Sequence, residues 1–219
     1  MNVLFDLDGT LTDPGDGFVA CVSHALAKLD CRPRSDAEIR RHVGPPLEET
    51  LARLLEDRAQ IPDAVAFYRE RYSTIGFLEN AVYPGIEGVL HALHSREMCL
   101  FVATSKPTVY AQRILEHFGL RRFFRGVYGS ELDGTRSGKT ELLAYLMKQE
   151  RLSTGMMIGD RAQDIAGALA NGLTPVGALW GYGSREELEK AGAVHLCPCP
   201  SQLPQLVPQP GSVPGPSRV

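Results

Sequence analysis

Short apolar runs alternate with longer amphipathic segments along most of this chain. Apolar runs of about 4 to 8 residues are typical of strands covered on both faces, and apolar residues at every third or fourth position are typical of helices. The pattern predicts strands at Val3–Asp6, Met98–Thr104, Gly126–Tyr128, Gly155–Ile158 and Leu173–Val176, and helices at Ile86–Ser95, Thr108–Phe118, Lys139–Glu150, Asp164–Asn171 and Arg185–Ala191. Because strand, helix and next strand recur in order, we expect an α/β fold built on a doubly wound parallel sheet.

The interval from residue 14 to residue 80 departs from this alternation. Its apolar residues recur at helical spacing, at Phe18, Val22, Leu26 and Leu29 and again at Leu47, Leu51, Leu54 and Leu55. We therefore predict an all-helical cap domain at 14–80, inserted into a core domain formed by residues 1–13 and 81–196. Ligands bind beyond the carboxyl ends of parallel strands, so an insertion that leaves the first strand there would cover the binding site as a lid.

The last stretch, residues 197–219, is dense in proline and shows no apolar period. This composition is typical of disordered segments, and we expect a mostly disordered tail. Its Pro-x-x-Pro spacing could suit a partner domain, although an inert tail is the simpler interpretation. Cys197 and Cys199 could begin a zinc site, but no second Cys or His pair stands at zinc spacing.

Composition narrows the classes of partner. The chain has 219 residues, of which 43% are hydrophobic and 22% charged, as in ordinary globular proteins. A formal net charge of −3 argues against a broad basic surface for nucleic acid. The first apolar run is too short for a signal peptide, and no run approaches the roughly 20 apolar residues of a membrane span. The odd number of cysteines suits a reducing compartment. We expect a cytoplasmic protein; its oligomeric state stays open.

Asp6 and Asp8 stand two positions apart at the end of the first apolar run and are followed by Gly9. Side chains at such positions of a strand point to one face, so both carboxylates would lie at the mouth of the sheet. They would repel each other unless a cation or a shared proton intervened, and Mg²⁺ prefers oxygen ligands. An Asp-Gly turn is the alternative. An EF-hand is excluded, because Leu11 and Gly17 stand where it needs glycine and glutamate.

Further acidic residues follow the apolar run that ends at Gly159. Asp160 comes directly after it, and Asp164 lies one helical turn further. Asp160 could complete the metal site, and Asp164 could bind the ion or orient it through another ligand. Either residue could instead cap the following helix.

Two segments offer groups for phosphate. Thr104 and Ser105 end the second predicted strand, where hydroxyl groups and free backbone N–H groups at a helix start could hold a phosphate, although a simple helix cap explains them as well. Lys139 opens a later helix and could balance the carboxylates and hold phosphate oxygens. The residues around Lys139 copy the end of a nucleotide-binding P-loop, but Asp133 stands where its first glycine belongs.

Taken in order, these motifs resemble those of the haloacid dehalogenase-like hydrolases across roughly the first 195 residues. The matching segments are Asp6-Leu7-Asp8-Gly9-Thr10 for the first motif, Thr104 for the second, Lys139 for the third, and Gly159-Asp160 with Asp164 for the fourth. The helical insertion resembles the cap of the phosphoglycolate phosphatase-like subgroup, as do Gly44-Pro45-Pro46-Leu47 and Trp180-Gly181-Tyr182-Gly183. The resemblance implies a Rossmann-like core with a helical cap.

What the resemblance implies for chemistry is a magnesium-dependent phosphatase acting on a small-molecule phosphate ester. Asp6 would attack phosphorus to form an aspartyl-phosphate, while Asp8 would protonate the leaving oxygen and later activate water. Mg²⁺ would be held by the carboxylates of Asp6 and Asp160 and by the backbone carbonyl of Asp8. The phosphoryl oxygens would be held by Thr104, Ser105 and Lys139. An aspartate at position 8 is the phosphatase form of the motif, because expelling an alkoxide needs a proton and expelling a halide does not.

The expected activity is phosphoglycolate phosphatase-like, with a nucleoside monophosphate as the nearest alternative substrate. The same residues could serve a pyrophosphatase, a phosphomutase or a binding protein without turnover. Ser105 stands where relatives often carry asparagine, and Lys139 lacks the proline that often follows it. In the insertion, Arg41 is the candidate for gripping a substrate carboxylate, although a solvated arginine is the simpler interpretation.

Overall fold

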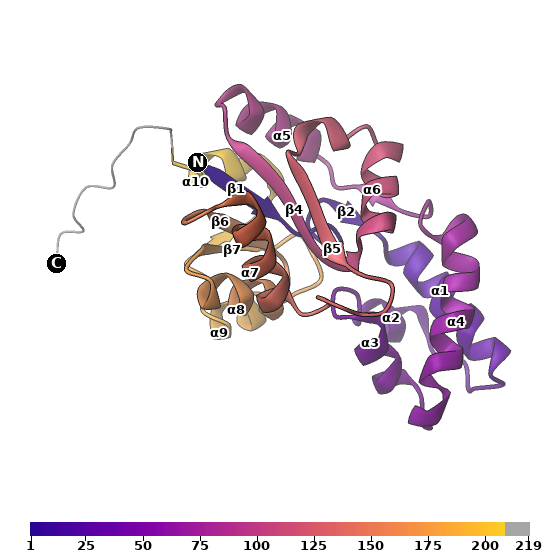
Figure 1. The fold of residues 1–219 in the computed structure, drawn as a ribbon. Helices are drawn as coiled ribbons and strands as arrows, with labels where there is room; N and C mark the ends of the chain where they lie inside the picture. Colours follow the sequence, from indigo (N-terminus) through magenta and orange to yellow (C-terminus); the bar gives the residue numbers. More distant parts are fainter. Residues whose placement is uncertain (209–219) are drawn as a thin grey trace.

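The computed structural model of the chain describes residues 1–208. Its centre is a six-stranded parallel sheet in the order β5-β4-β1-β6-β7-β8 (Figure 1). The strands are β1 Asn2–Phe5, β4 Cys99–Pro107, β5 Gly126–Ser130, β6 Met156–Gly159, β7 Thr174–Ala178 and β8 His195–Cys197. The predicted α/β fold with a parallel sheet is confirmed.

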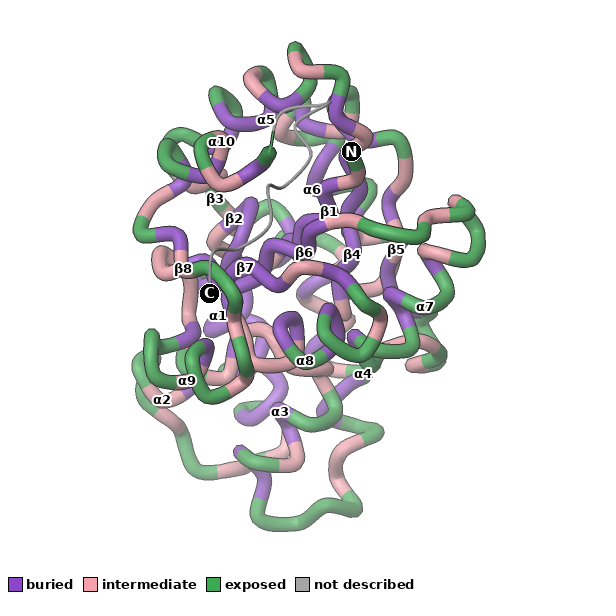
Figure 2. The backbone as a smooth tube through the Cα atoms, turned by 90° about the vertical axis from the view of Figure 1, so that its left-hand side faces the viewer, coloured by how far each residue is buried: buried purple, intermediate pink, exposed green. Residues whose placement is uncertain are grey.

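Helices cover both faces of this sheet. They are α5 Ile86–Ser95, α6 Thr108–His117, α7 Lys139–Glu150, α8 Ala162–Ala170, α9 Arg185–Lys190 and α10 Leu203–Leu206, with short 3₁₀ turns at Arg121–Phe123 and Pro200–Gln202. The side chains of β1 alternate between the two faces, as strand geometry requires. Val3 and Phe5 pack with α5 and α6, whereas Leu4 packs with α7 and α8. Figure 2 shows the buried strands between more exposed helices.

A helical insertion follows the first strand. It contains α1 Gly15–Lys28, α2 Asp36–Arg40, α3 Leu47–Leu54, a 3₁₀ turn at Arg58–Gln60, α4 Ile61–Arg71 and a π-helical turn, η2, at Tyr72–Gly76. The chain enters through β2 Thr12–Asp13 and leaves through β3 Ala81–Val82, which pair antiparallel. The insertion lies beyond the carboxyl ends of β4 and β5 (Figure 1). The stripe predicted at Val22 and Leu26 is buried in it.

The tail prediction was wrong for the part that the structure describes. Residue 197 belongs to β8, and a short turn and α10 follow it. Leu203 is fully buried and Val207 is 2% exposed, because this segment packs against α5. Arg96 at the end of α5 donates a hydrogen bond of 2.7 Å to the carbonyl of Pro204. Residues 209–219 lie outside the described part. Within residues 1–208, no helix has the length and apolar character needed to cross a membrane.

Removing the Leu203 side chain should weaken the fold. Leu203→Ala would leave a cavity at the contact between α10 and α5, and buried leucine-to-alanine changes cost about 2 to 5 kcal/mol. Denaturant unfolding should show this loss for Leu203→Ala, whereas Gln205→Ala, a change at an exposed position of the same helix, should stay close to the wild type. Equal stability of the two variants would mean that this segment contributes nothing to the core.

Candidate active site

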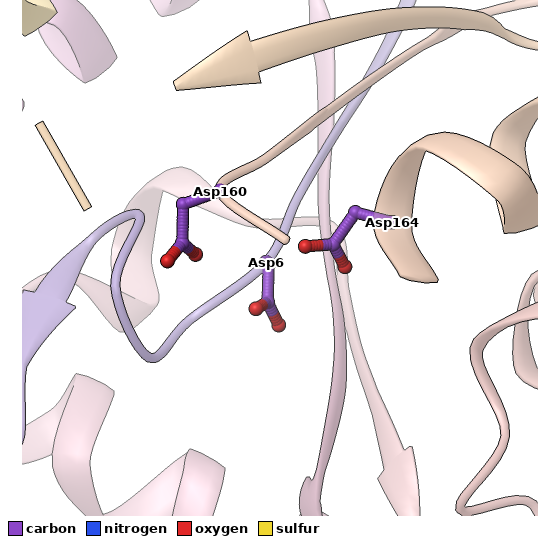
Figure 3. Close-up of side chains that lie close together, drawn as sticks. All are labelled: Asp6, Asp160 and Asp164. Atoms are coloured by element: carbon purple, nitrogen blue, oxygen red, sulfur yellow. The ribbon is translucent and has the colours of Figure 1, made fainter. Parts of the chain in front are cut away.

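Three buried carboxylates converge at the carboxyl ends of the two central strands. Asp6 follows β1, Asp160 follows β6, and Asp164 lies in the first turn of α8. One carboxylate oxygen from each residue lies within 4.8 Å of the others. Figure 3 shows the three side chains turned toward a shared space. The sequence predicted this convergence, because parallel strands end at the same edge of a sheet.

Lys139 supplies the positive charge inside this cluster. Its Nζ lies 2.9 Å from Oδ1 of Asp6, 2.7 Å from Oδ1 of Asp164 and 2.8 Å from the carbonyl oxygen of Ala103. Burial by itself lowers the pKa of this ammonium group, but the charges of Asp164 and Asp6 outweigh burial and raise the pKa overall. Lys139 therefore stays charged. Its ammonium group links Asp6, the candidate nucleophile, to Asp164 at the start of α8.

Within residues 1–208, the hydrogen bonds that Asp160 accepts come from neutral donors. The hydroxyl of Thr10 donates to its Oδ1 at 3.1 Å, and the backbone N–H of Tyr182 donates to its Oδ2 at 2.8 Å. Burial raises the pKa of Asp160 well above its ordinary value, and the charges of Asp164 and Asp6 add to the effect. Three carboxylates face one ammonium group here, so the cluster has the charge and the oxygen donors to hold a divalent cation.

Two glycines, Gly9 and Gly181, allow the loop after β1 to approach the segment at 180–183 closely. Gly9 has a φ of +89°, a conformation that favours glycine, and it turns the chain directly after Asp8. A Cβ atom on Gly181 would lie 2.3 Å from Cβ of Asp160 and 2.3 Å from the carbonyl oxygen of Gly9. Next to it, the indole N–H of Trp180 donates to the carbonyl of Thr10 at 2.9 Å. The segment at 180–183 thus closes against the metal-ligand candidates.

Asp8 has a different partner. Its Oδ1 lies 2.6 Å from Nζ of Lys106, and both side chains are largely buried, at 17% and 8% exposed. Burial raises the pKa of the Asp8 carboxyl, although the neighbouring Lys106 ammonium opposes this. Lys106 was not among the site residues predicted from the sequence. Its position at the end of a strand, two residues after Thr104, was the available signal.

The predicted phosphate-binding residues lie at the same place. Thr104 is buried at the end of β4, and its Oγ1 accepts a hydrogen bond of 3.2 Å from the backbone N–H of Lys106. The Oγ atom of Ser105 is buried and has no hydrogen-bond partner within residues 1–208, so it is free to donate to a ligand. Thr104 and Ser105 therefore line the same cleft as Asp6 and Asp8. Lys139 contacts Asp6 but is not among the described residues of the cleft lining.

A cleft between the core and the insertion opens onto these groups. Its walls include Asp6, Asp8, Ser105 and Lys106 from the core, together with aromatic and proline side chains at Phe18, Pro45, Pro46, Tyr68, Tyr72 and Tyr110. The loop at 43–44 is tied to α8, since Arg161 Nη1 donates to the carbonyl of Val43 at 2.5 Å and Gln163 donates to that of Gly44 at 2.8 Å. The insertion thus forms one wall of the cleft.

The sequence pattern of the family described as haloacid dehalogenase-like hydrolase matches residues 3–178. The chain belongs to this family. The predicted family and enzyme class are confirmed, and the matched range includes the motif residues Asp6, Asp8, Thr104, Lys139, Asp160 and Asp164. The assignment of roles to single residues within this hydrolase remains a prediction.

Several known proteins are similar to this hydrolase over nearly its whole length. A 5'-nucleotidase of Pseudomonas aeruginosa is 43% identical over 209 residues, which cover 94% of this chain and 95% of the relative. A phosphoglycolate phosphatase of Vibrio cholerae is 28% identical, with 86% of this chain and 88% of the relative covered. A tyrosine-protein kinase of Mycobacterium tuberculosis is 40% identical over 86% of this chain, which spans 65% of that relative.

The fold also has close counterparts among solved structures. A predicted phosphatase of Clostridium acetobutylicum superposes with a TM-score of 0.90 at 39% identity, covering 94% of this chain and 96% of that chain. A haloacid dehalogenase-like protein of Streptococcus pneumoniae superposes with a TM-score of 0.88 at 28% identity, covering 94% of this chain and 97% of that chain.

One predicted residue lies apart from the rest of this hydrolase's site. Arg41 is exposed and is not among the described residues that line the cleft, and its carbonyl oxygen accepts a hydrogen bond of 3.4 Å from Nη1 of Arg161. A role for its guanidinium in holding a substrate carboxylate therefore stays a prediction. The positively charged residues that do line the described cleft are Arg69 and Lys106.

A methyl group on Gly181 should damage the site while leaving most of the hydrolase folded. Gly181→Ala would push Asp160 away from the backbone of Gly9, and displacements near 1 Å in an active site can lower the rate on the order of 100-fold. Steady-state hydrolysis would measure this loss. The matched control is Gly88→Ala on the exposed side of α5, where no other described atom lies within 4 Å of the added Cβ and stability should rise by about 0.5 to 1 kcal/mol. Equal activity of both variants would contradict the tight-packing argument.

Proposed function

We propose that this hydrolase is a phosphatase that cleaves small-molecule phosphomonoesters through an aspartyl-phosphate on Asp6. The observation that carries the proposal is the contrast between its two motif carboxylates. Asp6 is buried and forms an ion pair with Lys139, whose Nζ lies 2.9 Å from its Oδ1. Asp8 lines the cleft, is paired with Lys106, and has a pKa that burial raises. Two aspartates with different environments suit two different roles.

In the first step, a carboxylate oxygen of Asp6 forms a bond to phosphorus while the bond from phosphorus to the ester oxygen breaks. The leaving oxygen takes the proton of Asp8 and departs as an alcohol. In the second step, Asp8 takes a proton from water as the water oxygen attacks phosphorus, and the bond to Asp6 breaks. Ester and water become alcohol and inorganic phosphate, and both aspartates return to their starting states.

The metal proposed for this site is Mg²⁺. Its ligands would come from Asp6 and Asp160, with the backbone carbonyl of Asp8 as predicted, and Asp164 is close enough to belong to the same cluster. When bound, Mg²⁺ would neutralise negative charge on the transferring phosphoryl group. The hydroxyl of Ser105, free of other partners within residues 1–208, would donate to a phosphoryl oxygen, beside Thr104.

The cleft supports a nucleoside monophosphate as substrate more than it supports phosphoglycolate, although relatives of both names exist. Aromatic side chains in its walls suit a planar leaving group, because bases stack on such rings. A carboxylate would need a free cation, but Arg69 already donates to the carbonyl of Leu132 at 2.8 Å and lies 3.8 Å from Glu48. The other cation of the described cleft lining, Lys106, lies beside Asp8, where the phosphoryl group rather than a substrate carboxylate would lie.

Release of inorganic phosphate tests the chemistry. The panel contains p-nitrophenyl phosphate, nucleoside monophosphates, phosphoglycolate and pyrophosphate, each with Mg²⁺ or with EDTA. We expect EDTA to abolish turnover, Asp6→Asn to lower kcat by roughly 10⁴-fold or more, and Asp8→Asn to lower it by roughly 10² to 10⁴-fold. Asp63→Asn, at an exposed position of α4, is the matched control and should keep wild-type activity. Full activity of Asp6→Asn would refute the nucleophile assignment.

Substrate choice has its own pair of variants. Tyr110→Leu removes an aromatic wall of the cleft and should raise KM for a nucleoside monophosphate about tenfold, since stacking on one ring contributes about 1 to 3 kcal/mol per base. Arg41→Ala should leave KM for every panel member unchanged, because its side chain is exposed and lies outside the cleft lining. A KM for phosphoglycolate that rises in Arg41→Ala would instead establish the predicted carboxylate contact.

A further inference from the structure

Lys106 links the proposed acid–base residue to the helical insertion. Its Nζ lies 2.6 Å from Oδ1 of Asp8 on one side and 5.4 Å from the centre of the Tyr72 ring on the other. The lysine comes from β4 in the core, and the tyrosine comes from η2 in the insertion. The ammonium group is therefore held between the acid–base residue and the part of the molecule that covers the cleft.

The positive charges around the cleft are not equally available to a ligand. Lys139 has three acceptors and is not among the described residues lining the cleft. Arg69 is engaged by the carbonyl of Leu132 and by Glu48. Lys106 lines the cleft, and the acceptor it contacts there is Asp8. An arriving phosphate dianion thus meets Lys106 as the cation that can change partners with the least rearrangement.

The present partner of Lys106 conflicts with catalysis. Oδ1 of Asp8 is held by Nζ of Lys106 at 2.6 Å, whereas the first step needs the Asp8 carboxyl at the leaving oxygen of the ester. The ion pair must therefore open when the substrate binds. A negatively charged phosphoryl oxygen could replace the Asp8 carboxylate as the acceptor of the hydrogen bond from Lys106.

We propose that Lys106 is a substrate-binding residue that exchanges Asp8 for a phosphoryl oxygen when the phosphate ester enters, and so frees Asp8 for proton transfer. This inference rests on the proposed phosphatase function. The Tyr72 ring keeps the ammonium near both partners throughout, because the face of an aromatic ring attracts a cation. Tyr72 itself is fixed by a stacked contact with Tyr68 at 5.3 Å and an edge contact with Tyr110 at 5.0 Å. The insertion thereby takes part in the exchange.

Binding of inorganic phosphate to the magnesium-loaded, full-length protein tests the exchange without any need for turnover. Lys106→Met keeps the length of the side chain but removes its charge, and calorimetric titration should show a dissociation constant about 10- to 100-fold higher than in the wild type. Lys106→Arg restores a cation and should recover most of the affinity. Thermal unfolding of each variant identifies any that fail to fold.

Two variants of Tyr72 provide a matched comparison. Tyr72→Phe keeps the ring and should bind phosphate within about twofold of the wild type, whereas Tyr72→Leu removes the aromatic face and should weaken binding about two- to fivefold. With turnover substrates, Lys106→Met should raise KM and lower kcat together, because the lysine acts on phosphate and on the release of Asp8.

An unchanged phosphate affinity in folded Lys106→Met would overturn the proposal, and so would a fall in kcat with no change in affinity, since the lysine would then act on Asp8 alone. Failure of the phosphatase function looks different. It would appear as a wild type that hydrolyses no panel member, whatever the affinity of Lys106→Met for phosphate.

Discussion

The structure depends on the placement of three buried carboxylates around one buried ammonium group. Asp6, Asp160 and Asp164 are nearly inaccessible to water, and Lys139 contacts two of them. A single buried charge without a partner would be strongly destabilising, so the strands that carry these groups must stay in register. The same arrangement leaves an excess of negative charge at the mouth of the sheet, which is the condition for binding a divalent cation.

Geometry at the strand ends then separates the two motif aspartates. Both line the cleft, but Asp6 contacts Lys139 in the buried cluster, whereas Asp8 contacts Lys106. Two residues that look alike in the sequence thus have different partners and different exposure to a ligand. The insertion would influence which substrates bind, because its aromatic side chains line the space in which a leaving group would lie.

The sequence predicted the sheet and the acidic cluster because both follow from local patterns. Apolar runs mark buried strands, and acidic residues directly after those runs must meet at one edge of a parallel sheet. Lys106 escaped prediction because its pairing with Asp8 joins residues 98 positions apart, and the lysine carries no pattern that names its partner. The packing of the C-terminal segment was not predicted for another reason. Its many prolines are typical of disordered segments, and they outweighed the helical spacing of Leu203 and Val207, both of which are buried.

The position of β1 in the middle of the sheet has a consequence for how the protein is made. Of the six strands in the sheet, this one leaves the ribosome first, yet its neighbours are β4 and β6, whose residues are synthesised about 100 and 150 positions later. Since Asp160 and Asp164 follow β6, the nascent chain cannot assemble the carboxylate cluster until β6 and the start of α8 have been translated. Until then β1 lacks one of its two neighbouring strands, and its unpaired edge and apolar residues are open to aggregation during synthesis.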